Sequence, residues 1–153
     1  MEGINSTNSQ VLDLSSTRKK SIDVITPSGE TKQLLIDLGD FNILTRLKSS
    51  YDKLESITMN ASEKLSQDTE NMDAIIDTLD DLDTEMKACI DYIFDTNVSE
   101  VCVGNGSIVS MYNGKFFFET IMEGLARLCG ETVSFEYKKM EQRIKKRTQK
   151  FIK

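Results

Sequence analysis

Residues 72–94 read MDAIIDTLDDLDTEMKACIDYIF, and this stretch decides the fold that the sequence predicts. Its large apolar side chains recur at alternating spacings of three and four, which places them on one face of an α-helix. They are Met72, Ile75, Leu79, Leu82, Met86, Cys89 and Ile93. Beyond a glycine-containing loop the same rhythm returns in Phe118, Ile121, Leu125, Leu128, Thr132 and Phe135. We expect these two helices to pack antiparallel across the loop and to form the core.

Two further elements are predicted upstream of this pair. The alternating residues 22–26, the turn-forming sequence PSGE at 27–30 and the apolar run at 32–37 predict one β-hairpin. After Asp40, which can cap a helix, an apolar stripe predicts a long first helix. Its members are Leu44, Leu47, Tyr51, Leu54, Ile57, Ala61 and Leu65.

The predicted fold class is mainly α, a helical hairpin or bundle of about three long helices with one N-terminal β-hairpin. At 153 residues the chain suits one domain that buries a core without disulfides or a metal. We divide it into a flexible arm at 1–21, a helical domain with the β-hairpin at 22–137, and a basic helix end at 138–153. Since a lone hairpin is marginal in water, we expect it to lie on the helices or to extend the sheet of a neighbouring subunit.

Acidic residues dominate the middle of the chain, where residues 63–95 contain eleven Asp or Glu and two Lys. Asp73 and Asp77 stand at helical spacing opposite the apolar stripe, so we interpret this acidic ridge as a hydrated outer face. A calcium-binding loop is excluded by spacing, because the sixth and twelfth positions counted from Asp81 hold Met and Tyr instead of Gly and Glu. The sequence therefore predicts no metal site.

The absence of histidine removes the commonest general base and the commonest transition-metal ligand. We therefore predict no enzyme activity, no catalytic residue and no cofactor. The three cysteines, Cys89, Cys102 and Cys129, form no C-x-x-C pair, and we expect reduced, buried thiols. Gly104 and Gly106 lack the Lys-Ser/Thr pair of a phosphate-binding loop, so we interpret them as part of a turn.

The C-terminal segment 138–153 has the opposite charge, with eight Lys or Arg and one Glu. Nucleic-acid binding through this segment is disfavoured, because it has little aromatic interleaving and the whole chain has a formal net charge of −6. A second interpretation is self-association, in which the basic helix end of one copy meets the acidic ridge of another. A third is an adaptor or chaperone that holds a helical client through Met, Leu and Phe side chains.

No membrane segment is expected, because no stretch approaches about 18 uninterrupted apolar residues. The polar N-terminus also lacks the apolar middle region of a signal peptide. We expect the protein to remain inside a cell unless it leaves as part of an assembly.

The order of the predicted elements leads to a resemblance. A β-hairpin, a Leu-rich helix, an acidic helix ending IDYIFD at 90–95, a loop of small residues and YNGKFFF at 112–118 follow one another between residues 22 and 131. This arrangement resembles small tail-assembly proteins of tailed phages that infect Gram-positive bacteria, among them the tail assembly chaperones. The resemblance rests on element order and a diffuse aromatic pattern.

The resemblance implies a non-enzymatic protein of phage tail morphogenesis, located in the bacterial host cytoplasm or in the virion. A tail assembly chaperone would bind a helical tape-measure protein. The alternatives are a structural virion component or homo-oligomeric scaffold, and a nucleic-acid-binding accessory protein that uses the basic C-terminus. For Phe117 and Phe118 there are two alternative interpretations, burial in the core and contact with a partner. The residues that we select for partner binding are Tyr112, Phe116, Phe117, Lys139, Arg143 and Arg147.

Overall fold

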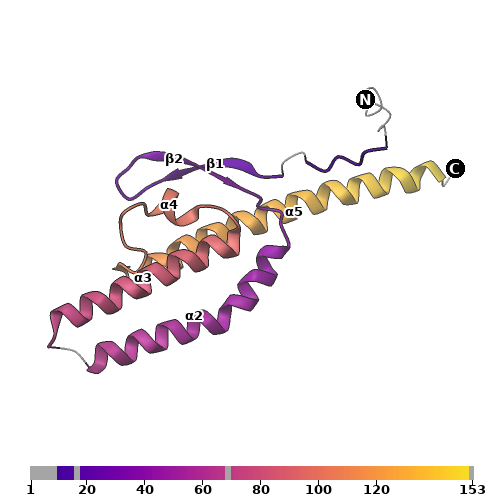
Figure 1. Cartoon of the computed structure of the whole chain (residues 1–153). Coiled ribbons are helices and arrows are strands. Elements are labelled where there is room, and N and C mark those ends of the chain that lie inside the picture. Colours follow the sequence, from indigo (N-terminus) through magenta and orange to yellow (C-terminus); the bar gives the residue numbers. More distant parts are fainter. Residues whose placement is uncertain (1–9, 16–17, 68–69, 152–153) are drawn as a thin grey trace, which may run out of the picture.

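Long helices and one N-terminal antiparallel β-hairpin make up the computed structural model, which describes residues 10–15, 18–67 and 70–151 (Figure 1). The elements are β1 (Lys20–Ile25), β2 (Thr31–Ile36), α2 (Asn42–Gln67), α3 (Met72–Phe94), α4 (Val98–Cys102), β3 (Met111–Tyr112), β4 (Lys115–Phe116) and α5 (Phe117–Phe151). The predicted fold class is confirmed. Residues 1–9 and 16–17 of the predicted arm, Asp68 of the acidic ridge and Lys153 of the basic end lie outside the described residues.

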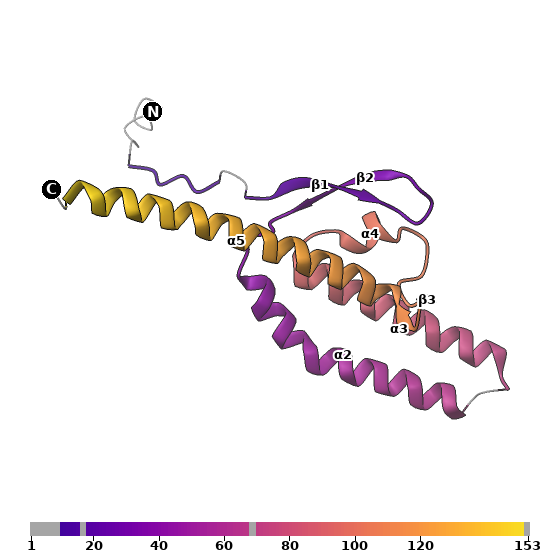
Figure 2. The same ribbon diagram turned by 180° about the vertical axis from the view of Figure 1, so that it is seen from behind.

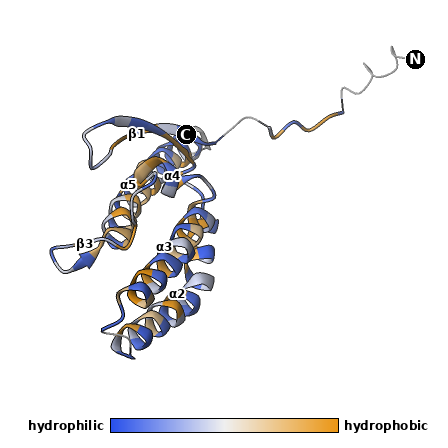
Figure 3. Cartoon of the chain, turned by 60° about the vertical axis from the view of Figure 1, so that its left-hand side comes forward, coloured by the Kyte–Doolittle hydropathy of each residue, from blue (hydrophilic) through white to orange (hydrophobic). Residues whose placement is uncertain are grey.

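α2 and α3 form an antiparallel helical hairpin, which Figure 2 shows from behind. Where α2 begins and α3 ends, the Arg46 Nε donates a 2.8 Å hydrogen bond to the Ile93 carbonyl. Farther along the pair, Ile57 and Ala61 of α2 are buried together with Leu82 of α3. In Figure 3 both helices alternate hydrophobic and hydrophilic residues along their length, as the helical period of the sequence requires.

Side-chain caps set the ends of these helices. The Asp40 Oδ1 accepts a 2.9 Å hydrogen bond from the Asn42 N–H at the start of α2, as the sequence predicts. The Asn71 Oδ1 accepts a 3.2 Å bond from the Ala74 N–H and starts α3. α3 ends at Phe94, and the next residue, Asp95, caps it with a φ of 54° in the left-handed region.

α5 runs in the same direction as α3, so the predicted antiparallel packing of these two helices is wrong. α5 starts beside the middle of α3, because the Ile108 N–H donates a 2.6 Å bond to Asp83 while its carbonyl accepts a 2.8 Å bond from the Phe118 N–H. Later in α5, Cys129 lies near Asp37 and Asp40, at the end of the body where α3 finishes. The physical reason is the connection at 95–116, which folds back along α3 through α4 before α5 begins.

The β-hairpin lies on the helical body, which confirms one of the two predicted placements. β1 and β2 pair in the register Ile22↔Leu34 and Val24↔Lys32. Leu34 is completely buried and Ile36 almost completely, because this face of β2 packs against α4. The Thr96 Oγ1 also donates a 2.6 Å bond to the Leu35 carbonyl, which joins the outer edge of β2 to the end of α3.

The acidic ridge is not uniformly hydrated, and this prediction is wrong at two positions. Asp83 accepts hydrogen bonds from Ser107 and from the Ile108 N–H, and it forms a 2.9 Å ion pair with Lys87. Asp91 accepts a 2.7 Å bond from the Ser99 N–H and a 2.6 Å bond from the Ser99 hydroxyl. These two carboxylates fasten the returning connection to α3, a role that helical spacing alone does not reveal.

Candidate protein-binding surface

One apolar face of α2 stays uncovered beside its contact with α3. Leu44 and Tyr51 are both 63% exposed, whereas Leu47 and Leu54 are half-buried. Their spacings of three and four place the four side chains on one stripe of the helix. The stripe predicted for this helix is therefore divided: its C-terminal part packs on α3, whereas Leu44 and Tyr51 in its N-terminal part are exposed to solvent.

The start of α5 and the strand before it supply the opposite wall of a groove. Tyr51, Leu54 and Met59 of α2 line a hollow of about 350 Å³ together with Met86, Phe116 and Phe118. A neighbouring open hollow of about 400 Å³, which shares Tyr51 and is lined by α2 alone, extends this surface past Leu47 to Leu44. The name α2 groove is used below for the surface formed by Leu44, Leu47, Tyr51, Leu54, Met59, Met86, Phe116 and Phe118.

Carboxylates predominate on the rim of the α2 groove. Among the described residues that line its two hollows, the charged side chains are those of Asp52, Glu55, Glu119 and Lys48. All four are exposed. An apolar floor with a mostly negative rim favours a ligand whose apolar face is bordered by positive charge.

The second half of α5 extends beyond the body as a continuous helix (Figure 1). Every residue from 133 to 149 is exposed, and the name α5 arm is used below for this segment. Its aliphatic and aromatic side chains at spacings of four, three and four lie on one stripe. They are Val133, Tyr137, Met140 and Ile144. The arm thus presents an amphipathic helix without a partner among the described residues.

Basic side chains flank the apolar stripe of the α5 arm. Lys139, Arg143 and Arg147 follow one another at spacings of four, which places them along one side of the helix. The Lys139 ammonium lies 4.7 Å from the centre of the Phe135 ring and 3.9 Å from a Glu136 carboxylate oxygen. These contacts are exposed, so the basic row remains available to a partner.

The six residues predicted to bind partners do not form one site. Phe116 is half-buried in the α2 groove, Phe117 faces a different hollow, and Tyr112 is exposed in the short β3–β4 hairpin. Phe118, for which a core position competed, is buried. The predicted basic residues lie on the arm, about 40 Å farther along α5 at about 1.5 Å per residue. The structure therefore separates an aromatic part from a basic part.

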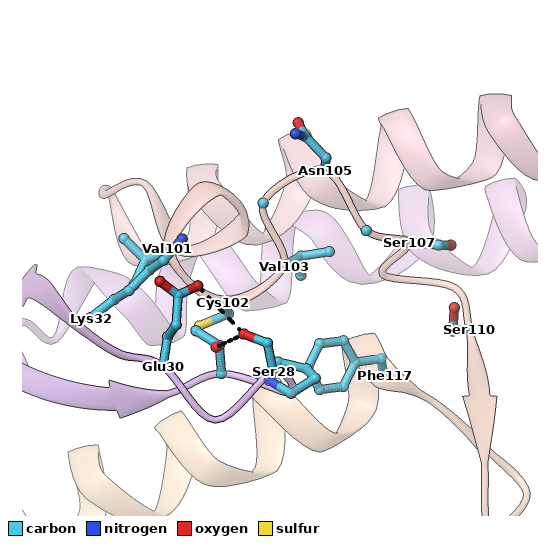
Figure 4. Close-up of a pocket in the computed structure, with 14 residues that line it drawn as sticks. Ser28, Glu30, Lys32, Val101, Cys102, Val103, Asn105, Ser107, Ser110 and Phe117 are labelled. Atoms are coloured by element: carbon cyan, nitrogen blue, oxygen red, sulfur yellow. Dashed lines mark hydrogen bonds between the residues drawn. The ribbon is translucent and has the colours of Figure 1, made fainter.

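Phe117 lines a hollow of about 440 Å³ between the β1–β2 turn and the loop after α4 (Figure 4). On the β1–β2 turn, the Ser28 hydroxyl lies 3.4 Å from a Glu30 carboxylate oxygen and 3.0 Å from the Thr26 hydroxyl. Cys102 also borders the hollow. These hydroxyl contacts are exposed and join residues two apart in the chain, so they are explained by the structure of the β1–β2 turn.

The glycine loop beside this hollow is a turn, as predicted. The Gly104 N–H donates a 3.0 Å bond to the Ser99 carbonyl, and the Gly106 N–H donates a 3.0 Å bond to the Val103 carbonyl. Both amide groups are therefore used within the chain and cannot cradle a phosphate. The Gly106 carbonyl in turn accepts a 2.7 Å bond from Lys87, which fixes the loop on α3.

All three cysteines are free thiols, and Cys89 and Cys102 are buried as predicted, while Cys129 is half-buried. Burial raises the pKa of each thiol; the nearby carboxylate of Asp91 adds to this effect at Cys102, and those of Asp37 and Asp40 add to it at Cys129. A thiol with a raised pKa stays protonated near neutral pH and is a poor nucleophile. The cysteines are therefore explained by packing.

The described part of the chain offers few other kinds of site. Within it, no cluster of Cys, Asp or Glu is arranged to hold a metal ion, and no helix combines the length and apolarity needed to span a membrane. Comparison with protein-family models, curated proteins and solved structures finds no match. The α2 groove and the α5 arm are therefore the candidate surfaces for binding a partner.

Proposed function

We propose that this protein is a non-enzymatic assembly protein that binds the apolar face of another protein's helix in the α2 groove. The observation that carries the proposal is a row of apolar side chains, of which Leu44 and Tyr51 are largely exposed, on the wall of a groove rimmed mostly by carboxylates. Covering apolar surface contributes roughly 25 cal/mol per Å², and exposed patches with polar rims mark interaction sites.

The shape of the groove supports a helical ligand. It follows the axis of α2 from Leu44 to Met59, which corresponds to about 22 Å of helix at about 1.5 Å per residue. A helix laid into such a groove anchors side chains at spacings of three and four. Met59 and Met86 suit this task, because the flexible thioether adapts to differently shaped side chains.

The resemblance to phage tail-assembly proteins supports a specific setting. We propose that the protein acts in tail morphogenesis in the host cytoplasm, where its client is the helical tape-measure protein. A long helical client exposes apolar stripes until its own partners arrive. A chaperone that covers them in the α2 groove would keep such a client from aggregating.

Co-expression with the tape-measure protein of the same phage tests the proposal. The tape-measure protein should remain in the soluble fraction and co-purify with the wild-type chain. Tyr51→Asp should lower the recovered complex by at least about tenfold, because it places a charge on the apolar wall.

Tyr92→Asp is the matched control. Tyr92 is also an exposed tyrosine, at 55% against 63% for Tyr51, but it lies on α3 and does not line the groove. This variant should retain the complex. Equal loss in both variants, or a wild-type chain that binds no tape-measure protein, would contradict the proposal.

A further inference from the structure

We propose that the α5 arm of a second copy of this chain occupies the α2 groove, so that copies associate head to tail. The inference rests on the proposed function, because it uses the same groove and names the helix that fills it before a client arrives. A client would then have to displace a neighbour's arm.

The arm cannot reach the groove of its own chain. α5 is one continuous helix from Phe117 to Phe151, and its first residues already form a wall of the groove. The helix then runs along α3, and from residue 133 on it leads away from the body, as both ribbon views show (Figures 1 and 2). Folding it back would break the helix and its backbone hydrogen bonds, so an arm that occupies the groove has to come from another copy.

The arm and the groove match in length and in apolar pattern. Residues 133–149 span about 25 Å of helix, close to the length of about 22 Å given above for the groove. On the arm, Val133, Tyr137, Met140 and Ile144 form a single exposed stripe, as a helix needs in order to pack into an apolar groove. An isolated helix of this length is marginal in water, so a partner would stabilise it.

The charges favour this pairing over the pairing of two arms. Residues 133–149 contain six basic and two acidic side chains, whereas three of the four charged side chains on the groove rim are acidic. An arm laid into the groove brings opposite charges together. Two arms laid side by side would bring like charges together, which is unfavourable.

Nucleic acid fits the arm less well than a protein groove does. Phosphates would neutralise the basic row of Lys139, Arg143 and Arg147, but they would leave the neighbouring apolar stripe in water. The α2 groove covers both features at once. Each copy would have one arm and one groove, so the contact is heterologous and either closes into a ring or continues as a filament.

The mass of the full-length protein in solution, measured by light scattering or sedimentation over a range of concentrations, tests the inference. The wild-type mass should rise above the 17.3 kDa of one chain as the concentration increases. Raising the ionic strength from about 0.1 M to about 0.5 M should weaken association several-fold, because the charged flanks are exposed.

The decisive experiment uses two variants, one altered in the groove and the other altered on the α5 arm. Tyr51→Asp in the groove and Ile144→Asp on the arm should each remain monomeric at concentrations where the wild type associates. An equimolar mixture should form a particle of two chains and no larger species, because only one intact groove and one intact arm remain. Tyr92→Asp, which lies on neither surface, and Ser134→Asp, which lies on the arm but off its apolar stripe and its basic row, should behave as the wild type does.

Each outcome decides the matter. The inference would be overturned by a wild type that stays monomeric or by a mixture of the two variants that stays monomeric. It would also be overturned if Ile144→Asp prevented association and Tyr51→Asp did not, which is the result expected if two arms paired with each other. DNA binding by monomeric wild type in place of association would overturn it as well. A monomeric wild type that still binds the tape-measure protein would leave the proposed function intact, whereas head-to-tail association without client binding would support the inference and contradict the proposed function.

Discussion

The two halves of α5 belong to one helix and have opposite surroundings. In the first half Phe118, Ile121 and Leu125 are buried against the body. In the second half, from Val133 to Gln149, every residue is exposed although the apolar period continues through Met140 and Ile144. The same pattern therefore builds a core where α3 is present and a free surface where α3 has ended.

Helical periodicity therefore identifies an apolar face but not the element that covers it. α3 ends at Phe94, whereas α5 extends several turns beyond that point and has no described helix beside it there. The apolar stripe of the α5 arm and the exposed part of the stripe on α2 are both left uncovered within the described part of the chain. Both surfaces are left over from a body whose helices differ in length and direction.

Substitution within the two halves should give the largest contrast. Leu125→Ala should lower the free energy of unfolding by about 2 to 5 kcal/mol, because Leu125 is only 5% exposed and its loss leaves a cavity. Ile144→Ala should change it by less than about 0.5 kcal/mol, since Ile144 is 52% exposed. Urea unfolding at low protein concentration measures both, and equal effects would contradict the division of α5.

The start of the buried half depends on Asp83. Asp83→Ala should cost about 1 to 3 kcal/mol, because it leaves the buried Ile108 N–H without its acceptor and Lys87 without its ion pair. Asp80→Ala on the exposed side of α3 is the control and should be nearly neutral. A similar midpoint for the two variants in thermal unfolding would show that Asp83 does not anchor the connection.

The boundary between the halves lies near Asp40, whose charge acts on Cys129. Burial opposes ionisation of Asp40, but the hydrogen bonds from Arg46 and from the Asn42 N–H prevail and hold its pKa below the usual value. Because the folded-state pKa is lowered, the stabilisation is present above the unfolded-state pKa and is lost as the pH falls through the folded-state pKa.

Asp40→Ala should therefore cost about 1 to 2 kcal/mol at neutral pH, as loss of a helix cap does. The difference from the wild type should begin to shrink as the pH falls below the unfolded-state pKa of about 4, and it should diminish further as the pH falls through the lower folded-state pKa. Urea midpoints of both proteins at neutral and acidic pH measure this. A difference that stays constant across the range would assign the effect to packing instead of charge.

Removal of residues 133–153 should have the smallest effect on the body. The described side chains of this segment bury little, so the unfolding free energy of the monomer should change by less than about 0.5 kcal/mol. In the intact monomer, amide hydrogens of the arm should exchange much faster than those of residues 118–129. Slow exchange in a verified monomer, or loss of folding on truncation, would show that the arm is part of the core.

The candidate surface was only partly predictable. Phe116 and the basic row of Lys139, Arg143 and Arg147 could be selected from residue type and spacing, but their separation could not. Tyr51 and Leu44 were recognised as apolar helix positions without any sign of their exposure. One signal in the sequence could have indicated this exposure. Ile43 and Ser50, which are buried, lie next to Leu44 and Tyr51 on the helix, so the face that could be covered is wider than one neighbouring helix needs.

The helices and the β-hairpin follow from local periodicity in the sequence, and the glycine turn and the charge of each segment follow from residue type. All of these depend on residues that are close together in the chain. Only the tertiary structure decided that α5 runs parallel to α3 and that Asp83 and Asp91 hold the connection. It also decided which apolar stripes remain uncovered. These features depend on contacts such as those of Asp83 with Ile108 and of Thr96 with Leu35, which join residues far apart in the chain.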